Sequence, residues 1–260
     1  MKPAGRRRER ILQMLRKKQF ATVSDLAETL ACSRMTIRRD LDHLESAGLL
    51  ERSHGAAAIS RRITLEFAMG DKVDVSRVEK DAIGRAAARL VAPGQRIILD
   101  TGTTTLALAR ALRTCGSIIV VTTSLTVVST LLGANSIECM LLGGTVRKSS
   151  PDLYGPLLEE NLSRMHPDWA FIGCDGLSVD GGLTTGDARV ARATALMVAG
   201  ASRVALLVDS SKAANDSFMK FAELSDLDVL ITDDAMPGEI LDAARAADVQ
   251  TIIVHPTEGD

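Results

Sequence analysis

The sequence predicts an α/β protein in two parts, an N-terminal winged helix-turn-helix and a C-terminal doubly wound, mostly parallel α/β domain. Short segments with apolar residues at helical spacing occupy the first part, and from Arg96 onward apolar runs alternate with helical segments. The second pattern is typical of a parallel sheet covered by helices on both faces. We expect the domains over residues 1–57 and 78–260, joined by a linker over residues 58–77.

The charge of the chain is divided in the same way. Residues 1–62 carry 14 Lys and Arg against 7 Asp and Glu, a net charge of +7. Residues 63–260 carry 17 against 26, a net charge of −9. A basic end joined to an acidic body indicates that the first segment alone meets a polyanion. The alternative for the charge is a solvated basic face. The alternative for the helices expected in this segment is a small helical interaction module whose arginines are only solvated.

Three helices and a strand hairpin are expected in the N-terminal part. Residues 9–19 have apolar residues at helical spacing and predict the first helix. Ser24 is a candidate N-cap for the second helix. Ser33 is a candidate N-cap for a third helix that ends near residue 47. A strand at residues 49–52 and a turn at residues 54–55 complete this part.

The third helix is expected to bind DNA in the major groove. Ile37, Leu41 and Leu44 recur at i, i+4 and i+7 and predict a buried stripe. The polar residues near the helix start lie mostly away from this stripe, where recognition helices contact base edges. Arg can form two hydrogen bonds with guanine, and Thr can contact a phosphate or a thymine methyl group. The candidate DNA-binding residues of the helix and the hairpin are Ser33, Arg34, Met35, Thr36, Arg38, Arg39, Arg52 and His54.

Strands and helices alternate in the C-terminal part, after a helix that begins near Val78. The expected strands are 96–100, 117–124, the segment IECMLLGG at 137–144, 168–173, 204–209, 228–233 and 251–255. The expected helices are 106–113, 125–133, 187–201 and 238–247, and residues 101–105 are expected to form a loop. In sheets of this type, ligands bind at the carboxyl ends of the strands.

Small and polar residues follow five of the expected strands. The stretch Asp100–Thr105 places a Gly and hydroxyl side chains before a helix, which suits a phosphate because backbone N–H groups are exposed there. Asp100 would instead accept a hydrogen bond from a sugar hydroxyl. The other strand ends are Thr122–Ser124, Gly143–Gly144, Gly173–Gly176 and Asp209–Lys212. Ordinary turn and cap chemistry explains each one alone, but together they favour a small anionic polyol such as a sugar phosphate.

The segment VSDLAETLACSRMTIRRDLDHLESAGLLERSHGAA resembles the N-terminal domain of the DeoR family of bacterial transcription regulators, through TIRRDL and GLLERSHG above all. The segments LDTGTTTLALARAL, VTTSL, LLGGTVR, FIGCDGL, GGLTT and VDSSK resemble the sensor domain of that family. That domain is itself similar to ribose-5-phosphate isomerase. The resemblance covers almost the whole chain. It implies a repressor that a phosphorylated sugar or catabolic intermediate releases from DNA.

The resemblance also implies a set of effector-binding residues. They are Asp100, Gly102, Thr103, Thr104, Thr105, Thr123, Ser124, Gly144, Asp175 and Lys212. The chain departs from the family pattern in three places. Ala56 replaces a second wing Gly, Thr123 replaces an Asn of many relatives, and Arg189 stands near the position of a Glu. Arg189 is either an added anion contact or a solvent-facing side chain, so the identity of the effector cannot be copied from a relative.

Two other functions are compatible with parts of this pattern. A sugar-phosphate isomerase would need a general base beside the reacting carbon. The segment GCDGL supplies one carboxylate, Asp175, without the second acid of the isomerase pattern, so no catalytic residues and no enzyme are expected. A transcriptional activator, or a regulator that responds to a protein partner, stays open because the sign of regulation depends on operator position.

The remaining expectations concern partners and location. Operator half-sites are usually bound by symmetric dimers, so we expect a homo-oligomer, either a dimer or a tetramer. Neither a cofactor nor a metal site is expected, because the four Cys and four His residues are scattered without CxxC or HExxH. The cysteine pattern favours a reducing cytoplasm. The start of the chain lacks a secretory leader pattern, and no apolar run reaches the roughly 18 residues of a membrane span.

Overall fold

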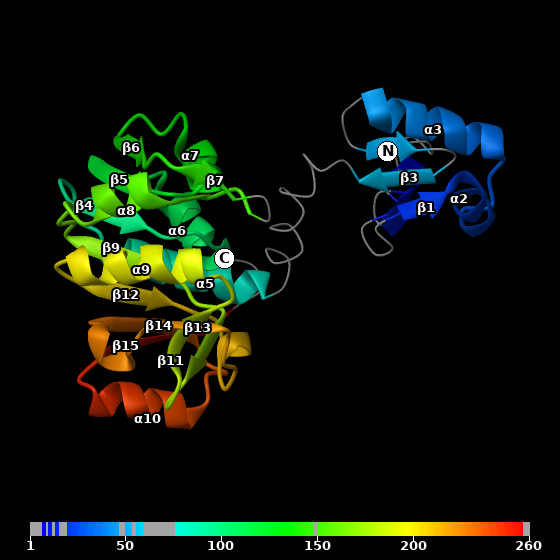
Figure 1. Ribbon diagram of the computed structural model, residues 1–260. Helices are drawn as coiled ribbons and strands as arrows, with labels where there is room; N and C mark the ends of the chain where they lie inside the picture. Colours follow the sequence, from blue (N-terminus) through cyan, green and yellow to red (C-terminus); the bar gives the residue numbers. More distant parts are fainter. Residues whose placement is uncertain are drawn as a thin grey trace. The chain divides into compact units, whose positions relative to one another are not determined.

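Figure 1 shows the computed structural model of the chain. The residues that the structure describes are 7–8, 10–11, 14–15, 20–46, 50–53, 56–59, 76–147 and 150–256. The chain divides into two compact units, Met1–Gly70 and Asp71–Asp260, and each unit is described by itself. Most of the segment expected as a linker, and the turn at residues 54–55, lie outside the described residues.

The first unit contains a helix-turn-helix and a small antiparallel sheet (Figure 1). Its helices are α2 (Val23–Thr29) and α3 (Arg34–Ser46), and its strands are β1 (Phe20–Thr22), β2 (Leu50–Ser53) and β3 (Ala56–Ile59). The strand order is β1-β3-β2, so β2 and β3 form the expected hairpin, and β3 continues past residue 57. Ile11 and Leu15 of the first expected helix are helical and fully buried. They pack in one cluster with Ile37, Leu41 and Leu44 of α3, as the apolar spacing predicted.

The caps of the two helices differ in how well they were predicted. The prediction that Ser24 caps α2 is wrong, because the helix already begins at Val23. Thr22 is the N-cap: its Oγ1 accepts a hydrogen bond from the N–H of Asp25 at 3.1 Å, and the Asp25 carboxylate accepts one from the N–H of Thr22 at 3.1 Å. This is a reciprocal capping box. The prediction for Ser33 is confirmed, since its Oγ accepts the N–H of Thr36 at 3.1 Å.

Asp40 connects α3 to the start of the first expected helix. Its carboxylate is 2% exposed and accepts hydrogen bonds from Arg7 Nε at 2.5 Å and Arg8 Nε at 2.9 Å. Burial alone raises the pKa of Asp40, but the two guanidinium groups outweigh burial and leave the pKa below its usual value. Asp40 therefore fixes the helix that carries the candidate DNA-binding residues against the body of its unit.

The second unit is built on a seven-stranded sheet in which all neighbouring strands are parallel. Its strands, in spatial order, are β15 (Gln250–Val254), β14 (Val229–Asp233), β12 (Val204–Leu207), β9 (Trp169–Ile172), β4 (Arg96–Leu99), β5 (Ile118–Thr122) and β6 (Ile137–Leu141). The inner strands β9, β12 and β14 are buried along their whole length. These apolar runs confirm the predicted α/β fold.

Helices cover both faces of this sheet. They are α5 (Arg77–Ala88), α6 (Thr103–Leu112), α7 (Leu125–Leu131), α8 (Pro156–Leu162), α9 (Ala188–Gly200) and α10 (Gly238–Ala246). The strand order runs one way from β4 through β5 to β6, and the opposite way from β9 through β12 and β14 to β15. Because crossovers between parallel strands are right-handed, α6 and α7 cover one face, and α9 and α10 cover the other. The order of the sheet therefore reverses between β4 and β9.

Two smaller sheets were not predicted. One is antiparallel and contains β10 (Gly176–Ser178), β11 (Gly182–Thr185) and β13 (Met219–Ala222). The other is a hairpin of β7 (Thr145–Val146) and β8 (Leu153–Tyr154). The expected loop over residues 101–105 is partly wrong, because α6 already begins at Thr103. The hairpin and the early start of α6 both shape the site described below.

Removing the charge of Asp40 tests how the first unit is held together. We expect Asp40→Asn to lower its free energy of unfolding by about 2–4 kcal/mol, since two charge-assisted hydrogen bonds are lost in a mostly buried place. In the wild type, this contribution is present above the unfolded pKa of about 3.9 and is lost as the pH falls towards the lowered folded pKa. Urea denaturation followed by far-UV circular dichroism measures the change.

Trp169 gives that experiment an internal reference. It is the single Trp of the chain and lies in β9, so its fluorescence reports on the second unit alone. The Trp169 transition should not move in Asp40→Asn. Asp42→Asn, which changes an exposed carboxylate of the same helix, is the matched control. Equal effects of the two substitutions would contradict the anchoring role of Asp40.

Candidate functional site

The five polar strand ends predicted from the sequence follow five adjacent strands. In spatial order these strands are β12, β9, β4, β5 and β6, with Asp100 after the central strand β4. Neighbouring strands lie roughly 4.8 Å apart, so the ends of β12 and β6 are roughly 19 Å apart. A small ligand at Asp100 therefore meets the ends of β9, β4 and β5 first. Asp100 also lies where the strand order reverses, the place at which open α/β sheets bind ligands.

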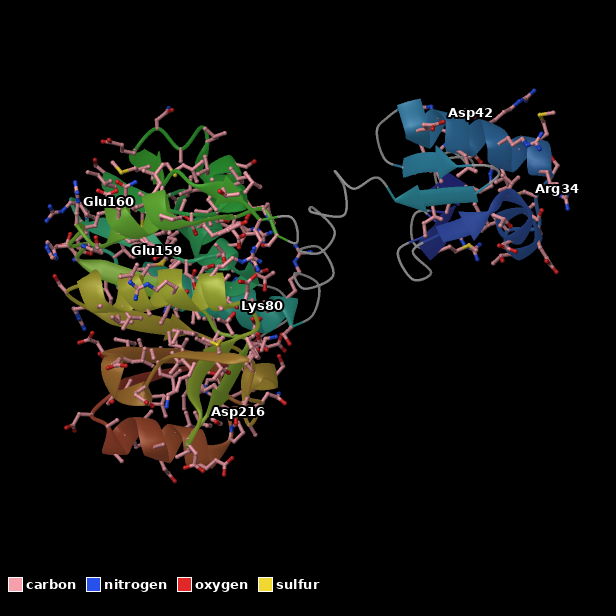
Figure 2. All side chains as sticks on the ribbon, in the orientation of Figure 1. Arg34, Asp42, Lys80, Glu159, Glu160 and Asp216 are labelled. Atoms are coloured by element: carbon pink, nitrogen blue, oxygen red, sulfur yellow. The ribbon has the colours of Figure 1, made fainter. Side chains whose placement is uncertain are left out.

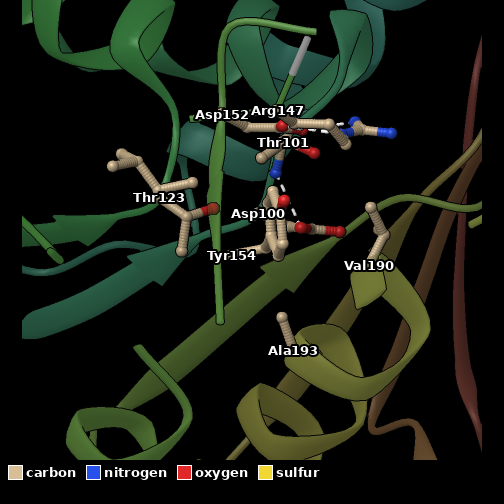
Figure 3. Close-up of a pocket in the computed structure, with 9 residues that line it drawn as sticks. Asp100, Thr101, Thr123, Arg147, Asp152, Tyr154, Val190 and Ala193 are labelled. Carbon is tan, nitrogen blue, oxygen red and sulfur yellow. Dashed lines mark hydrogen bonds and ion pairs between the residues drawn. The ribbon is translucent and has the colours of Figure 1, made fainter. Parts of the chain in front are cut away.

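A pocket lies at this point (Figure 3). Its empty space is about 240 Å³, part of which is open to solvent. The lining residues are Asp100, Thr101, Thr123, Arg147, Asp152, Leu153, Tyr154, Val190 and Ala193. They come from the ends of β4 and β5, from the β7–β8 hairpin and from α9. Of the predicted effector-binding residues, Asp100 and Thr123 line this pocket.

Asp100 is the buried acid of the pocket. It is 3% exposed, and its Oδ1 accepts the N–H of Thr101 at 2.7 Å. Its Oδ2 has two longer contacts, with Gly173 N–H at 3.5 Å and Thr194 Oγ1 at 3.4 Å. Burial raises the pKa of Asp100 to about 7, and the nearby charge of Asp152 adds to this effect while the hydrogen bonds oppose it. The carboxyl group can therefore accept or donate a hydrogen bond near neutral pH.

The predicted Thr residues after β4 form the first turn of α6. Thr105 is fully buried, and its hydroxyl donates to the Gly102 carbonyl at 3.1 Å. Thr104 is buried as well, and Thr103 is half-buried. Ser124 is buried and caps α7, since its Oγ accepts the N–H of Val127 at 3.3 Å. These hydroxyl groups shape the backbone around the pocket, and none of them is among its lining residues.

Gly144, which follows the edge strand β6, has a packing role. A Cβ atom at this position would lie 2.7 Å from the carbonyl oxygen of Tyr154. Gly144 therefore lets the chain after β6 approach β8 closely. It does not line the pocket itself, but it allows Tyr154 to stand where it does.

Asp175 and Lys212 belong to a neighbouring group after β9 and β12. Asp175 accepts hydrogen bonds from Thr185 Oγ1 at 2.8 Å and from the N–H of Gly186 at 3.1 Å. The pKa of Cys174 is raised to about 12, mainly by burial; the charge of Asp175 contributes to the rise, and that of Lys212 opposes it. Asp175 and Lys212 thus lie within electrostatic reach of one thiol. Neither lines the pocket at Asp100.

An arginine and an aspartate of the β7–β8 hairpin were missed as site residues. Arg147 Nε donates to Asp152 Oδ1 at 2.7 Å, and Arg147 Nη2 donates to Asp152 Oδ2 at 2.5 Å. We call this pair of hydrogen bonds the fork. Because Asp152 is 2% exposed, its carboxylate is largely shielded from water. The sequence offered one signal, the Arg that ends LLGGTVR. Its partner could not be recognised, because nothing in the spacing shows that the chain turns back after Arg147.

Arg189 is exposed to solvent, with 48% of its side chain accessible, and it pairs with Asp187. Its Nε and Nη2 donate to Asp187 at 2.9 and 2.5 Å, and its Cζ lies 4.4 Å from the ring centre of Tyr154. Asp187 is the N-cap of α9, accepting the N–H of Arg189 at 2.9 Å. The second acid contact of Arg147 is also with Asp187, from Nη1 at 3.5 Å. The pocket is therefore bordered by alternating acidic and basic side chains.

The candidate DNA-binding surface is the outer side of α3. Arg34, Arg38 and Arg39 are exposed, and Met35 is 59% exposed. Figure 2 shows Arg34 and Asp42 on opposite halves of this helix. Ser33 is exposed and Thr36 is half-buried. Positive charge is therefore concentrated at the helix start, as base contacts from a recognition helix require.

The two remaining DNA-binding candidates belong to the wing. Arg52 lies on β2, of which the backbone is described, and His54 lies outside the described residues.

Within the described ranges, no group of three or more His, Cys, Asp and Glu side chains could hold a metal ion. No helix in that part of the chain combines the length and the apolar character needed to cross a membrane.

A helix-turn-helix with exposed arginines near the start of α3, together with an α/β domain that has a pocket beside a buried acid, defines a ligand-responsive transcriptional regulator. Comparison with protein families agrees. A DeoR-like helix-turn-helix domain matches residues 7–62, and the DeoR C terminal sensor domain matches residues 76–234. The chain belongs to the DeoR family of transcriptional regulators.

Relatives match along nearly the whole chain. The HTH-type transcriptional regulator GlpR of Haloferax volcanii is 37% identical over 97% of this chain and 98% of its own length. The HTH-type transcriptional repressor GlcR of Bacillus subtilis is 33% identical over 96% of both chains. The glycerol-3-phosphate regulon repressor of Escherichia coli is 27% identical over 89% of this chain and 91% of its own. These relatives are transcriptional regulators and not enzymes, which confirms the interpretation of the sequence.

A solved structure shows a weaker likeness. Ribose 5-phosphate isomerase A of Methanocaldococcus jannaschii aligns with 54% of this chain and 55% of its own, at 20% identity and a TM-score of 0.41. This partial likeness says nothing about activity.

Asp100 should make the stability of the second unit depend on pH. Because its folded pKa of about 7 is above the unfolded value of about 3.9, the folded state binds the proton more tightly. The stabilising contribution is complete below about pH 4 and is lost as the pH rises through about 7. We expect Asp100→Asn to gain stability relative to wild type across this window, measured as thermal unfolding by Trp169 fluorescence.

Asp228→Asn is the matched control for Asp100→Asn. Asp228 also accepts a backbone N–H, from Val204 at 2.7 Å, but it is exposed and lies at the amino end of the strands. Asp228→Asn should not show the gain in stability that Asp100→Asn shows as the pH rises. A constant difference between Asp100→Asn and wild type from pH 4 to pH 8 would show that Asp100 has an ordinary pKa.

Proposed function

We propose that the protein represses a sugar or carbohydrate catabolic operon and that a phosphorylated sugar or related metabolite releases it from the operator. The observation that carries the proposal is the pocket at the reversal of the strand order, where Asp100, Thr123 and Arg147 meet. An acid and hydroxyl groups suit a polyol, and a guanidinium group suits a phosphate. The names of the similar GlcR and glycerol-3-phosphate regulon repressors are consistent with this class of regulator.

The proposed effector site extends beyond the residues that line the pocket. The backbone N–H groups at the start of α6, after Gly102, supply the donors that a helix N-terminus offers to an anion. The remaining residues proposed from the sequence, Thr103 to Thr105, Ser124, Gly144, Asp175 and Lys212, follow the carboxyl ends of the same sheet. Asp100, raised in pKa and therefore partly protonated near neutral pH, can donate to or accept from a sugar hydroxyl.

The proposed DNA-binding residues act from α3 and the wing. Arg38 and Arg39 contact base edges or phosphates, while Ser33, Arg34, Met35 and Thr36 contribute from the helix start. Arg52 and His54 of the wing contact the phosphate backbone of the DNA. The exposure of the three α3 arginines supports this assignment.

The rest of the proposal concerns organisation. Residues 1–57 bind DNA, residues 58–77 connect the parts, and residues 78–260 bind the effector and form the oligomer. A single helix-turn-helix makes few contacts, so a dimer or tetramer on paired half-sites is needed for tight binding. We place the protein in the cytoplasm, where both DNA and phosphorylated metabolites are present.

Substitutions in α3 test the DNA-binding half of the proposal. Arg38→Ala and Arg39→Ala should each weaken binding to a specific duplex by about 1–3 kcal/mol, the range for a guanine contact. A duplex selected from random DNA by the purified protein, labelled for fluorescence anisotropy, provides the measurement. Arg245→Ala removes an exposed Arg from α10 and should leave affinity unchanged. Unchanged affinity in both α3 variants would rule out α3 as the recognition helix.

A ligand screen tests the effector half of the proposal. Phosphorylated sugars and glycerol phosphate are each paired with the unphosphorylated compound, and thermal unfolding is followed by Trp169 fluorescence. A ligand that binds the folded state at 100 times its Kd adds about 2.7 kcal/mol to the free energy of unfolding. We expect one phosphorylated member to raise the melting temperature and to lower affinity for the selected duplex. If no phosphorylated compound lowers operator affinity, the proposed effector class is wrong.

A further inference from the structure

Arg147 has one strongly held side and one weakly held side. Nε and Nη2 form the fork with Asp152 at 2.7 and 2.5 Å. Nη1 reaches Asp187 Oδ2 only at 3.5 Å, at the limit of a hydrogen bond. The Arg147 side chain is 15% exposed, and it is one of the lining residues of the pocket. The edge of the guanidinium group that bears Nη1 is therefore its exchangeable edge.

Asp187 depends little on its contact with Arg147. Its Oδ1 accepts both the N–H and Nε of Arg189 at 2.9 Å, and its Oδ2 accepts Nη2 of Arg189 at 2.5 Å. The hydrogen bond from Arg189 leads the causes that hold the pKa of Asp187 well below its usual range, so the group is a permanent anion. Loss of the 3.5 Å contact would leave Asp187 with Arg189 and with its role as N-cap of α9. A carboxylate with these partners can yield Arg147 to another anion at small cost.

Arg189 is held in place from a second side. Its Cζ lies 4.4 Å from the ring centre of Tyr154, a pocket-lining residue, which is cation–π distance. Arg189 can therefore keep Asp187 engaged while Arg147 changes partner. The two arginines have different tasks: Arg147 lines the pocket, and Arg189 lies behind Asp187.

We propose that Asp187 occupies the place beside Arg147 that the phosphate group of the effector takes on binding. The inference rests on the proposed function, because it assigns the anion-recognising residue of that same pocket. A phosphate monoester carries a charge of about −1.5 to −2 at neutral pH, against −1 for the carboxylate it replaces. The planar donor edge of Arg suits a tetrahedral oxyanion better than a point charge does. Arg147 is thus the specificity residue for phosphorylated over unphosphorylated effectors.

Exchange also changes a contact between two elements. Arg147 follows β7, and Asp187 begins α9, so the 3.5 Å contact joins the β7–β8 hairpin to the start of that helix. An effector phosphate at Arg147 breaks this contact and keeps the fork with Asp152. Binding of the anion is therefore coupled to the freedom of the hairpin relative to α9.

Inorganic phosphate is the probe for the test, because its affinity measures binding beside Arg147 without any contribution from the sugar. Isothermal titration calorimetry of the full-length protein measures its affinity. Asp187→Asn keeps a capping side chain and removes the competing charge, so phosphate should bind roughly three- to tenfold more tightly. Arg147→Lys keeps a cation beside Asp152 but loses the fork, so phosphate should bind about tenfold or more weakly. Glu160→Gln, an exposed carboxylate on α8 (Figure 2), controls for net charge and should have no effect.

A double-mutant cycle separates exchange from simple electrostatics. Arg189→Gln removes the Arg189 side chain from Asp187, so Asp187 should hold Arg147 more strongly. The variant should therefore bind phosphate more weakly. If Arg189 acts through Asp187, the double variant Asp187→Asn with Arg189→Gln will bind phosphate as tightly as Asp187→Asn alone. Additive effects of the two substitutions would overturn the exchange. Equal phosphate affinity in wild type, Asp187→Asn and Arg147→Lys, including no binding in any of them, would overturn the role of Arg147.

The ligand screen distinguishes this inference from the proposed function. If a phosphorylated sugar releases the operator equally from wild type and Arg147→Lys, the function stands and the inference fails. If phosphate affinity follows Arg147 and Asp187 but no phosphorylated sugar releases the operator, the inference stands and the effector class fails.

Discussion

The reversal of strand order between β4 and β9 is the constraint on which the site depends. Right-handed crossovers send the chain after β4 to one face of the sheet and bring α9 to the other, so the segments beyond these two strands diverge. A pocket lined by side chains lies between them. Asp100 lies there, away from water, with one short and two long hydrogen bonds. Its raised pKa is therefore a consequence of topology as much as of the residue itself.

The features that could be predicted from the sequence are those set by residues close together in the chain. Apolar runs located the parallel strands, and the stripe of Ile37, Leu41 and Leu44 located α3. The start of α6 was predicted too late because β-branched Thr residues disfavour helices, whereas the burial of Thr104 and Thr105 overrides that preference. The contact of Arg147 with Asp187 could not be predicted, because Asp187 is 40 residues away along the chain. The paired hydrogen bonds with Asp152 depend on a chain reversal within the β7–β8 hairpin, which leaves no periodic pattern in the sequence.

The two units use charge in opposite ways. The first has a net positive segment with exposed arginines on one helix, which suits a long polyanion whose many phosphates are met at a distance. The second is acidic overall, and its arginines at the pocket are already paired with Asp152 and Asp187. Attraction of an anion by the field of the whole unit is therefore weak there. Recognition at the pocket has to come from directed hydrogen bonds and from the release of an internal partner.

This difference bears on how an effector can act on DNA binding. A ligand shifts an equilibrium only by its difference in affinity for the two states, and allosteric couplings typically amount to 1–3 kcal/mol. An ion-pair contact with some solvent access contributes about 0.2–1 kcal/mol. Loss of the Arg147–Asp187 contact alone would therefore supply at most the lower end of the roughly 1–3 kcal/mol that allosteric coupling needs. The remainder has to come from contacts that the effector makes in one state and not in the other. Asp100 suits that role, because a buried acid with long bonds to Gly173 and Thr194 gains most from a new partner. Anion exchange at Arg147 would then select the class of ligand, and the bond to Asp100 would supply most of the coupling.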